Sequence, residues 1–381
     1  MLAFGCWIEK TVGMRGAPDP QLAMLTTLST EELIPAGHPI RRIRRVVEDV
    51  LVELDREFDA MYSTKGRRSV PPEALLKATI LMALYSIRSE RAFCERLNYD
   101  LLFKWFLDLP IDAKAFDATT FTKNRTRLLN HDIADRFFEA VVRQAHLRRY
   151  VSSEHFSVDG TLLEAWASHK SFKPNDQAPG DGNDDDDIRP TGRNREVDWR
   201  GKKRSNTTHT STTDPEARLA RKSMNTAARL CYSGHLLMEN RNALLVDAEL
   251  TAATGYAERD TAAEMLGRLP KTTRRRIVGA DKGYDTAGFV AEVHHLGFTP
   301  HVAPHNNGRR SAIDRRTTRH PGHQVSQRIR PRIEEPFGWM KTIAGGHKLR
   351  YIGRDRNRAW FKMTAAIYNL LRITALDAAP A

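Results

Sequence analysis

Acidic side chains that lie far apart in the sequence have the types and surroundings expected of a divalent-metal site. Asp159 ends a short β-type run over residues 155–159, and Asp281 ends the apolar run 277–280. If these strands are parallel neighbours, both carboxylates lie at the carboxyl edge of one sheet, where open α/β sheets hold their ligands. Carboxylates so close raise each other's pKa, and a divalent cation that prefers oxygen ligands relieves the repulsion. The two aspartates therefore predict a metal site at this edge.

A third carboxylate is found when residues 330–341 are projected as a helix. At about 100° per residue, three apolar side chains fall within one narrow arc and predict the buried side: Ile333, Phe337 and Met340. Glu334 lies at the edge of that arc, and Arg330 and Lys341 share its stripe at spacings of four and seven. An acid that can bind metal is thus flanked by two cations that can bind phosphate. Pro336 indicates that the helix begins late or bends.

These segments resemble the acidic motifs of DDE transposases from bacterial insertion sequences, in the five-like branch of the insertion-sequence four/five superfamily. The motifs are Asp159-Gly160-Thr161, Asp281-Lys282-Gly283-Tyr284-Asp285 and Arg330-x3-Glu334-x6-Lys341. Three further segments are similar and extend the resemblance over about residues 39–375: Asp117-Ala118-Thr119-Thr120-Phe121, Thr213-Asp214-Pro215-Glu216-Ala217-Arg218 and Ala366-Ile367-Tyr368-Asn369-Leu370. One position departs from the family pattern, because Gln327 stands where a tyrosine usually precedes the arginine by three residues.

The resemblance implies a ribonuclease-H-like catalytic core with two Mg²⁺ or Mn²⁺ ions per active site. It assigns Asp159, Asp281 and Glu334 as catalytic residues and metal ligands, with Asp159 bridging both ions. Arg330 and Lys341 would hold the scissile or adjacent phosphate. Such enzymes cut DNA at the element's terminal inverted repeats and join the freed 3′-hydroxyl to target DNA, without a nucleotide cofactor. The expected partners are double-stranded DNA and a second copy of the chain in a homodimer.

The periodicity of apolar residues divides the chain into parts of different structure. Residues 1–38 show little periodicity and are interpreted as a loose leader, whereas 39–150 predict an all-helical domain that binds the DNA ends. Residues 151–375 alternate short β-type runs with helical stretches and predict an α/β domain with a mixed five-stranded sheet flanked by helices. Within it, residues 171–222 contain few apolar side chains and predict an extended insertion. Residues 376–381 form a tail.

The charge of the chain favours a polyanionic partner. Among 381 residues, 60 Lys and Arg against 47 Asp and Glu give a formal charge of +13. Two basic clusters are candidates for phosphate contact: the segment 301–350, and the group beside Trp199 that contains Arg200, Lys202, Lys203 and Arg204. A merely solvated charge run is the alternative for the second cluster.

The sequence contains no signal for a membrane or for export. No run approaches the roughly 18 apolar residues of a membrane span, and residues 1–13 lack the features of a secretion signal. Three cysteines without paired spacing favour neither a disulfide framework nor a cysteine zinc site. Together with the resemblance, these features predict a cytoplasmic, nucleoid-associated bacterial protein with no membrane partner.

Two other functions are compatible with the sequence. A DNA-binding protein without catalysis, either a repressor or a decayed transposase, would use the helical domain, with Thr120–Arg127 as a candidate groove-facing helix. A nuclease on the same ribonuclease-H-like core would cut DNA without joining it. The complete acidic set favours the transposase, because a protein that only binds DNA needs no three carboxylates facing a phosphate.

Overall fold

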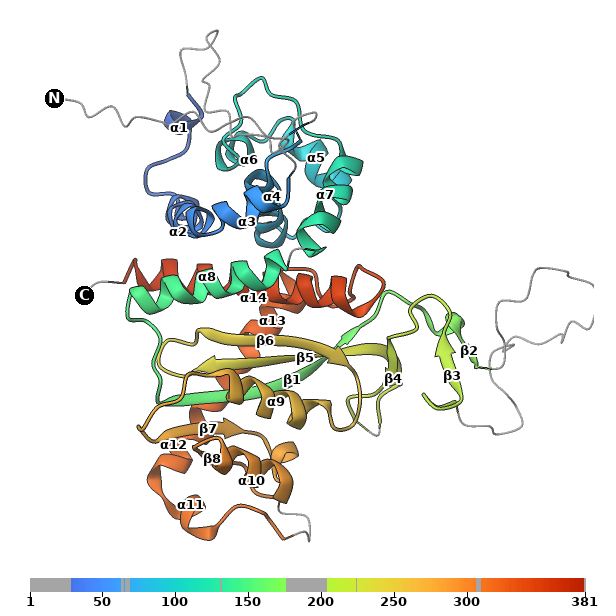
Figure 1. Ribbon diagram of the computed structural model, residues 1–381, viewed down its shortest axis with the longest axis vertical. Helices are drawn as coiled ribbons and strands as arrows, with labels where there is room; N and C mark the ends of the chain where they lie inside the picture. The colour runs from blue at the N-terminus through green and yellow to red at the C-terminus, as the bar shows by residue number, and fades with distance from the viewer. Residues whose placement is uncertain are drawn as a thin grey trace, which may run out of the picture. The chain divides into compact units, whose positions relative to one another are not determined.

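The structure is a computed structural model of the chain, and it forms two compact units (Figure 1). It describes residues 29–62, 65, 69–130, 132–175, 204–223, 225–305 and 310–379. Unit 1 comprises Met1–Tyr150, Ile343–Gly345 and Met363–Ala381, and unit 2 comprises Val151–Thr342 and Gly346–Lys362. The long helix α14 (Arg354–Leu376) contributes its residues through Lys362 to unit 2 and the remainder to unit 1. The sequence alone groups residues 363–375 with the second domain.

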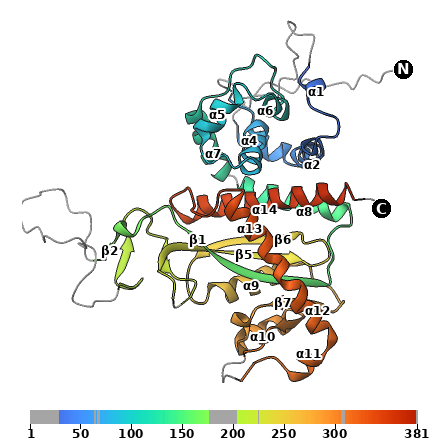
Figure 2. The ribbon, with the colours of Figure 1, turned by 180° about the vertical axis from the view of Figure 1, so that it is seen from behind.

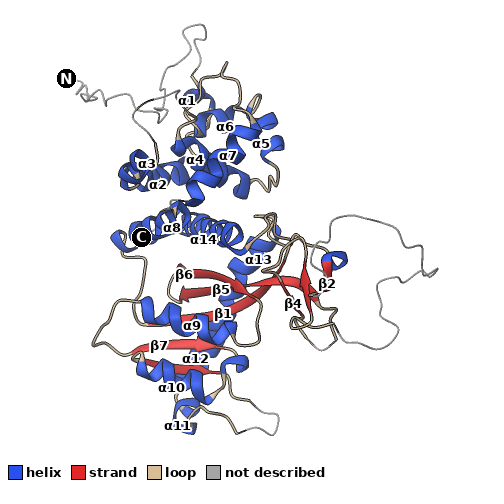
Figure 3. Ribbon diagram, turned by 45° about the vertical axis from the view of Figure 1, so that its right-hand side comes forward, coloured by secondary structure: helices blue, strands red, loops and turns tan. Residues whose placement is uncertain are grey.

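Unit 1 is built from helices whose apolar faces form its core (Figure 3). Its described helices before residue 150 are α1 (Thr30–Leu33), α2 (Pro39–Glu53), α3 (Asp55–Ala60), α4 (Pro72–Leu84), α5 (Glu90–Leu97), α6 (Leu101–Phe106), α7 (Ala118–Asn130) and α8 (Ile133–Leu147). α2 begins at Pro39, which suits a first turn because no N–H is needed there, and His38 caps it. The buried residues of α2 recur every three or four positions: Ile40, Ile43, Val46, Val47, Val50 and Leu51.

A short helix lies within the segment that the sequence marks as a leader. Ser29 caps α1 by accepting from a backbone N–H of its first turn. The Glu31 side chain accepts hydrogen bonds from the Trp105 indole and the Arg41 guanidinium. These contacts hold α1 to α6 and α2, so described structure in unit 1 begins before Pro39.

Unit 2 is built around a mixed sheet. Its long strands are β1 (His155–Glu164), β5 (Arg229–Glu239), β6 (Leu245–Ala252), β7 (Arg276–Ala280) and β8 (Phe298–Val302). The order is β6-β5-β1-β7-β8, and the short β4 (Arg218–Ala220) pairs with the other end of β5. β5 is antiparallel to β1 and β6, whereas β7 and β8 run parallel to β1. These five strands and their flanking helices confirm the ribonuclease-H-like mixed sheet predicted from the sequence, with β4 as an addition.

Part of the predicted insertion lies within the described residues. The 3-10 turn η1 (His169–Ser171) leads into β2 (Phe172–Pro174), which pairs antiparallel with β3 (His209–Ser211) in a separate two-stranded sheet. Residues 176–203 lie outside the described residues. Regular backbone pairing therefore begins inside the segment that the sequence reads as extended.

Helices cover both faces of the main sheet (Figures 1 and 2). Even-numbered residues of β1 and β7 pack with α9 (Ala257–Arg268) and α10 (Ala287–His295) in one core: Phe156, Val158, Val278 and Ala280. On the other side, α12 (Pro321–Ile329) packs on β7 and β8, and η3 (Arg330–Ile333) packs on β1. Because side chains alternate along a strand, odd-numbered residues of β1 face η3 and the helix that follows it, α13 (Glu334–Thr342).

Asp159 does not end its strand, contrary to the prediction from sequence. β1 continues to Glu164 because β5 supplies an antiparallel partner for every residue from 156 to 164. The parallel partner β7 stops earlier, and Ser157 opposite Gly279 is the last pair. Asp159 therefore lies inside β1 but just beyond the end of its parallel pairing, which still places it at the carboxyl edge of β7.

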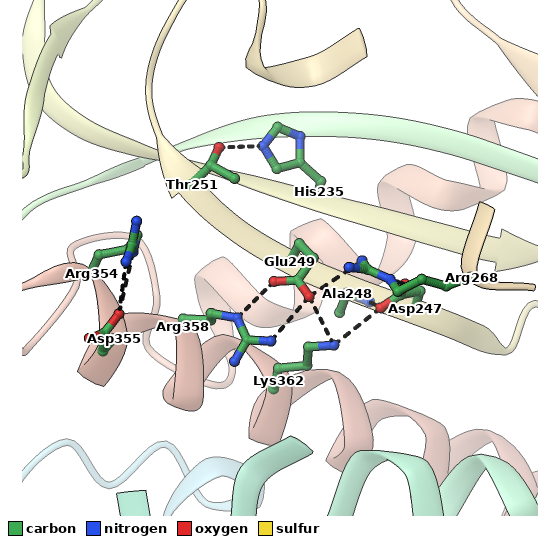
Figure 4. A network of polar contacts seen from close by, with 10 residues as sticks. All are labelled: His235, Asp247, Ala248, Glu249, Thr251, Arg268, Arg354, Asp355, Arg358 and Lys362. Atoms are coloured by element: carbon green, nitrogen blue, oxygen red, sulfur yellow. Dashed lines mark hydrogen bonds and ion pairs between the residues drawn. The ribbon is translucent and has the colours of Figure 1, made fainter. Parts of the chain in front are cut away.

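A buried ionic network joins β6, α9 and α14 within unit 2 (Figure 4). Lys362 Nζ lies 3.1 Å from Asp247 Oδ1 and 3.3 Å from Glu249 Oε1. Arg358 Nε is 2.8 Å from Glu249 Oε2, and Arg268 Nε is 2.8 Å from Asp247 Oδ2. Every acid in this group has a cationic partner, as charges removed from water require. The network ties the first part of α14 to β6.

Candidate active site

Asp159 and Asp281 come from neighbouring parallel strands in matching register. Ser157 pairs with Gly279, so continuing the register by two residues sets Asp159 beside Asp281. Adjacent strands lie about 4.8 Å apart, which brings both carboxylates to one place at the end of β7. Asp159 accepts a 2.9 Å hydrogen bond from the Gly160 N–H, and Asp281 accepts one of 2.6 Å from the Gly283 N–H. Neither carboxylate is in an ion pair with any residue that the structure describes.

The surroundings of Asp159 favour its neutral form. Burial raises the pKa of Asp159 to about 7, although the Gly160 N–H acts in the opposite direction. The negative charges of Asp281 and Glu258 also raise this pKa, and the positive charge of Arg330 lowers it. A cation bound between these acids would offset both the burial and the repulsion that keep the proton on Asp159.

Two basic side chains approach Asp159 from η3 and α13. Lys341 Nζ donates a 2.5 Å hydrogen bond to Thr161 Oγ1, two residues beyond Asp159 on the same face of β1. The charge of Arg330 acts on Asp159, and Arg330 Nε is buried with no hydrogen-bond partner among the described residues. A buried N–H without a partner is costly, so this donor is available for a ligand such as phosphate.

The predicted buried side of the third segment is confirmed, because Ile333, Phe337 and Met340 are all buried. Its helical form is irregular: residues 330–333 make the 3-10 turn η3, and α13 begins only at Glu334. Pro336 therefore falls in the first turn of α13, where the missing N–H has no carbonyl partner to lose. The late start that Pro336 predicts is confirmed.

Glu334 stands apart from the two aspartates. It is the exposed first residue of α13, four residues after Arg330 and seven before Lys341. Within the described part of the chain, no three His, Cys, Asp or Glu side chains come together as a metal-binding group. The structure thus gathers Asp159, Asp281, Arg330 and Lys341, and leaves Glu334 on the exposed surface of the adjoining helix. The oxygen donors of the aspartates nevertheless suit a hard divalent cation.

The sequence analysis misses two further groups that interact electrostatically with these aspartates, Glu258 and Tyr284. Glu258 lies in the first turn of α9, and its charge acts on Asp159. Tyr284 is 1% exposed, and burial and the charges of Glu258, Asp159 and Asp281 raise its pKa. An acidic residue in the first turn of a helix is typical of dipole stabilisation, so the sequence gives Glu258 no distinguishing signal.

Comparison with known proteins decides the family. Residues 154–370, more than half of the chain, match the transposase DDE domain, and residues 28–127 match a transposase domain described as DUF772. The chain belongs to the transposase DDE domain family. It therefore carries the catalytic domain of a DDE transposase, an enzyme of DNA transposition.

Two solved transposase structures are similar to this transposase at low sequence identity. The piggyBac transposase synaptic complex with hairpin DNA has a TM-score of 0.40 and 7% identity, over 92% of this chain and 78% of that one. The Mos1 strand transfer complex has a TM-score of 0.19 and 10% identity, over 83% and 82% of the two chains. No curated protein matches the chain. Among its described helices, none has the length and apolar character needed to cross a membrane.

The remaining predicted residues of the transposase are placed only in part. Gln327 Nε2 donates a 2.6 Å hydrogen bond to the His301 carbonyl and so ties α12 to β8. The basic cluster at residues 200–204 falls mostly outside the described residues: Arg200, Lys202 and Lys203. Arg204 begins the next described segment.

Asp285 has a different role from the helix cap that its position before α10 suggests. Thr286 is the N-cap residue, whereas Asp285 accepts 2.8 Å hydrogen bonds from the backbone N–H groups of His305 and Ala312. Asp285 therefore fixes both ends of the loop that follows β8.

Proposed function

We propose that this transposase binds the terminal inverted repeats of a bacterial insertion sequence of the five-like branch, and cuts and rejoins DNA there with divalent metal ions. The main support is the register of Asp159 and Asp281 on adjacent parallel strands, with Arg330 and Lys341 beside them. Both aspartates lie inside the segment that matches the family. We propose that it acts on double-stranded DNA in the bacterial cytoplasm, as a homodimer because two ends must be held together.

Asp159, Asp281 and Glu334 would hold two Mg²⁺ or Mn²⁺ ions. The two aspartates support this assignment because they offer oxygen ligands and neither is in an ion pair with a described Lys, Arg or His. When bound, the ions activate the attacking water or hydroxyl and stabilise the leaving oxygen of an in-line displacement. Asp159 and Asp281 would supply oxygen ligands from the edge of the sheet, and Glu334 would supply one from α13.

Arg330 and Lys341 would hold the phosphate next to these acids. Lys341 is already fixed beside β1 by its hydrogen bond to Thr161, and Arg330 has a donor without a partner. In the first step, a water oxygen bonds to phosphorus as the bond to the leaving 3′-oxygen breaks, which frees a 3′-hydroxyl at the element's end. In the second step, that hydroxyl attacks a target phosphate and releases a target 3′-hydroxyl. The second step replaces one phosphodiester bond with another of similar energy. The reaction therefore requires no nucleotide triphosphate.

Supercoiled plasmid that carries the element's two ends tests the function directly. In Mg²⁺ buffer the wild type should cut at the ends and transfer them, whereas Asp159→Asn should bind the ends without cutting. Glu334→Gln should lose cleavage, and Glu335→Gln, the neighbouring exposed glutamate, is its matched control. Cleavage by Asp159→Asn would refute the site. Binding without cleavage by the wild type would indicate a binding protein, and cleavage without transfer would indicate a nuclease.

The helical unit is our candidate for reading the terminal repeats, through α7. In this helix Thr122, Lys123 and Thr126 are exposed, whereas Arg125 is paired with Glu90. Lys123→Ala should weaken binding to the ends and reduce the salt dependence of binding by the equivalent of about one phosphate contact. Unchanged affinity and salt slope, measured by fluorescence anisotropy, would exclude α7 from the interface.

A further inference from the structure

An exposed tryptophan follows the strand that carries Asp159. Trp166 lies two residues after the end of β1 and is 52% exposed. Its chain neighbours Ala165 and Ala167 are buried, and the Ala165 N–H donates a 2.8 Å hydrogen bond to the Leu230 carbonyl. The indole therefore projects into solvent from a backbone that is fixed on both sides. Tryptophan in such a position is typical of a surface that binds a partner.

The loop of residues 346–350, which follows α13, places a cation against this ring. Lys348 forms a parallel bridge with Glu164, and the Leu349 N–H donates a 2.7 Å hydrogen bond to the Glu164 carbonyl. Because β5 pairs with the other edge of β1 at Glu164, the loop occupies the edge from which β7 is absent beyond Ala280. Lys348 Nζ lies 5.7 Å from the centroid of the Trp166 ring, within the range of a cation–π contact.

Positive charge exceeds negative charge along this part of β1. Arg229 and Lys348 share the carboxylate of Glu164. Lys222 is exposed and forms no ion pair with a described residue, and burial and its positive charge lower the pKa of Lys341. Lys341 in turn donates its hydrogen bond to Thr161, three residues before Glu164. Cations held this close to one another favour a polyanionic partner.

An exposed ring beside a lysine suits one particular form of DNA. The two faces of a base inside a duplex are already covered by its neighbours, so an indole can stack only on a base that is unpaired. We propose that Trp166 and Lys348 bind an unpaired DNA strand next to the active site, with the ring stacked on a base and the lysine on an adjoining phosphate. This inference rests on the proposed function. From Asp159 to Glu164 the strand spans about 17 Å, so the stacked base lies a few nucleotides from the phosphate that is cut.

Hydrogen bonds to a distant segment hold the chain after Lys348 in place. The Gly353 N–H donates a 3.4 Å hydrogen bond to Oδ1 of the buried Asp214, and the Arg354 N–H donates one of 2.8 Å to Glu216 Oε2. Both acids belong to the segment 213–218 that resembles the transposases. The lysine and the ring are therefore positioned before DNA arrives, which lowers the entropy lost on binding.

Binding of the full chain to oligonucleotides in EDTA, measured by fluorescence anisotropy, tests the proposal without cleavage. Trp166→Leu should weaken binding of a single-stranded oligonucleotide by about tenfold, whereas Trp166→Phe, which keeps a ring, should retain most of the affinity. Neither variant should change binding of the matching duplex. Lys348→Ala should reduce the salt dependence of single-strand binding by about one phosphate contact. Lys271→Ala, at an exposed lysine before β7 on the opposite edge of the sheet, is the matched control and should bind as the wild type does.

A 2-aminopurine base placed at successive positions of the oligonucleotide reports stacking directly. At one position the wild type should quench its fluorescence, and Trp166→Leu should not. Thermal unfolding of Trp166→Leu should match that of the wild type, because the ring is exposed. A destabilised variant would mean that the ring packs against the chain itself, which overturns the proposal.

The outcomes separate this inference from the proposed function. If the wild type cuts and joins the plasmid but Trp166→Leu binds and quenches the single strand as the wild type does, the function stands and the role of Trp166 is refuted. Equal weakening of single-strand and duplex binding by Trp166→Leu would also refute stacking on an unpaired base. If the wild type quenches 2-aminopurine through Trp166 but neither cuts nor joins the plasmid, the strand-binding site stands and the proposed function fails.

Discussion

Asp159→Asn should make the metal-free protein more stable, and more so at high pH. Burial, with the charges of Asp281 and Glu258, raises the pKa of Asp159 from 3.8 to about 7. Between these values the folded protein holds a proton that the unfolded chain releases, so stability falls as the pH rises toward 7. At roughly 1.4 kcal/mol per pKa unit, the loss is about 1.5 kcal/mol near pH 5 and about 4 kcal/mol near pH 8. Asparagine fills the same space without ionising and removes this loss.

Urea unfolding in EDTA measures the effect. The difference in free energy of unfolding between Asp159→Asn and the wild type should grow by about 2.5 kcal/mol from about pH 5 to about pH 8. Histidines titrate in the same range but cancel in the comparison. Asp260→Asn, an exposed aspartate on α9, should show no such growth. Mg²⁺ should stabilise the wild type and not the Asn variant, because only the wild type has the ligand. A gain that is equal at both pH values would refute the reasoning.

Three other predictions test the description of unit 2. Lys362→Met removes one cation from the network on β6, where two arginines still pair the carboxylates. It should lower the free energy of unfolding in urea by about 2 kcal/mol. Arg354→Met, which breaks an exposed ion pair, is the control and should lower it by less than about 0.5 kcal/mol. Burial lowers the pKa of His301 to about 4, so below pH 6.5 this histidine stays neutral in the folded protein while the unfolded chain takes up a proton. Stability should therefore fall as the pH drops from about 6.5 to 4. His301→Gln should reduce this dependence of stability on pH. Lys341→Ala should slow end cleavage by about 100-fold in single-turnover assays with little change in end binding.

The strands of unit 2 could be predicted from the sequence because buried runs such as 277–280 are nearly continuous in apolar residues. The length of β1 could not. Gly160 and Thr161 look like a turn after Asp159, and only pairing with β5, more than 60 residues away, carries the strand to Glu164. Similarly, α1 is fixed by Glu31 contacting Trp105, a tertiary contact that local periodicity does not contain.

The parts of the site that depend only on spacing along one segment could be predicted from the sequence. A helical projection of residues 330–341 finds the buried side, because that depends only on spacing along one segment. The nearness of Asp159 to Asp281 needed the additional assumption that their strands are parallel neighbours, which the structure meets. The effect of Glu258 on Asp159 could not be predicted, because it depends on how α9 packs against Gly160 of β1, a tertiary contact.

Two groups of acids on the same sheet differ in one respect, and that difference explains the chemistry of each. Burial alone would raise the pKa of Glu249, but hydrogen bonds from Arg358 and the charge of Lys362 hold it below its usual value. Asp159 is partly buried and is in no ion pair with a described residue, so its pKa rises to about 7. A protein that needed these acids only for stability would pair them, as it does on β6. Leaving them unpaired costs stability in the metal-free state. The proposed cation would displace the proton from Asp159, so metal affinity is expected to increase as the pH rises to about 7.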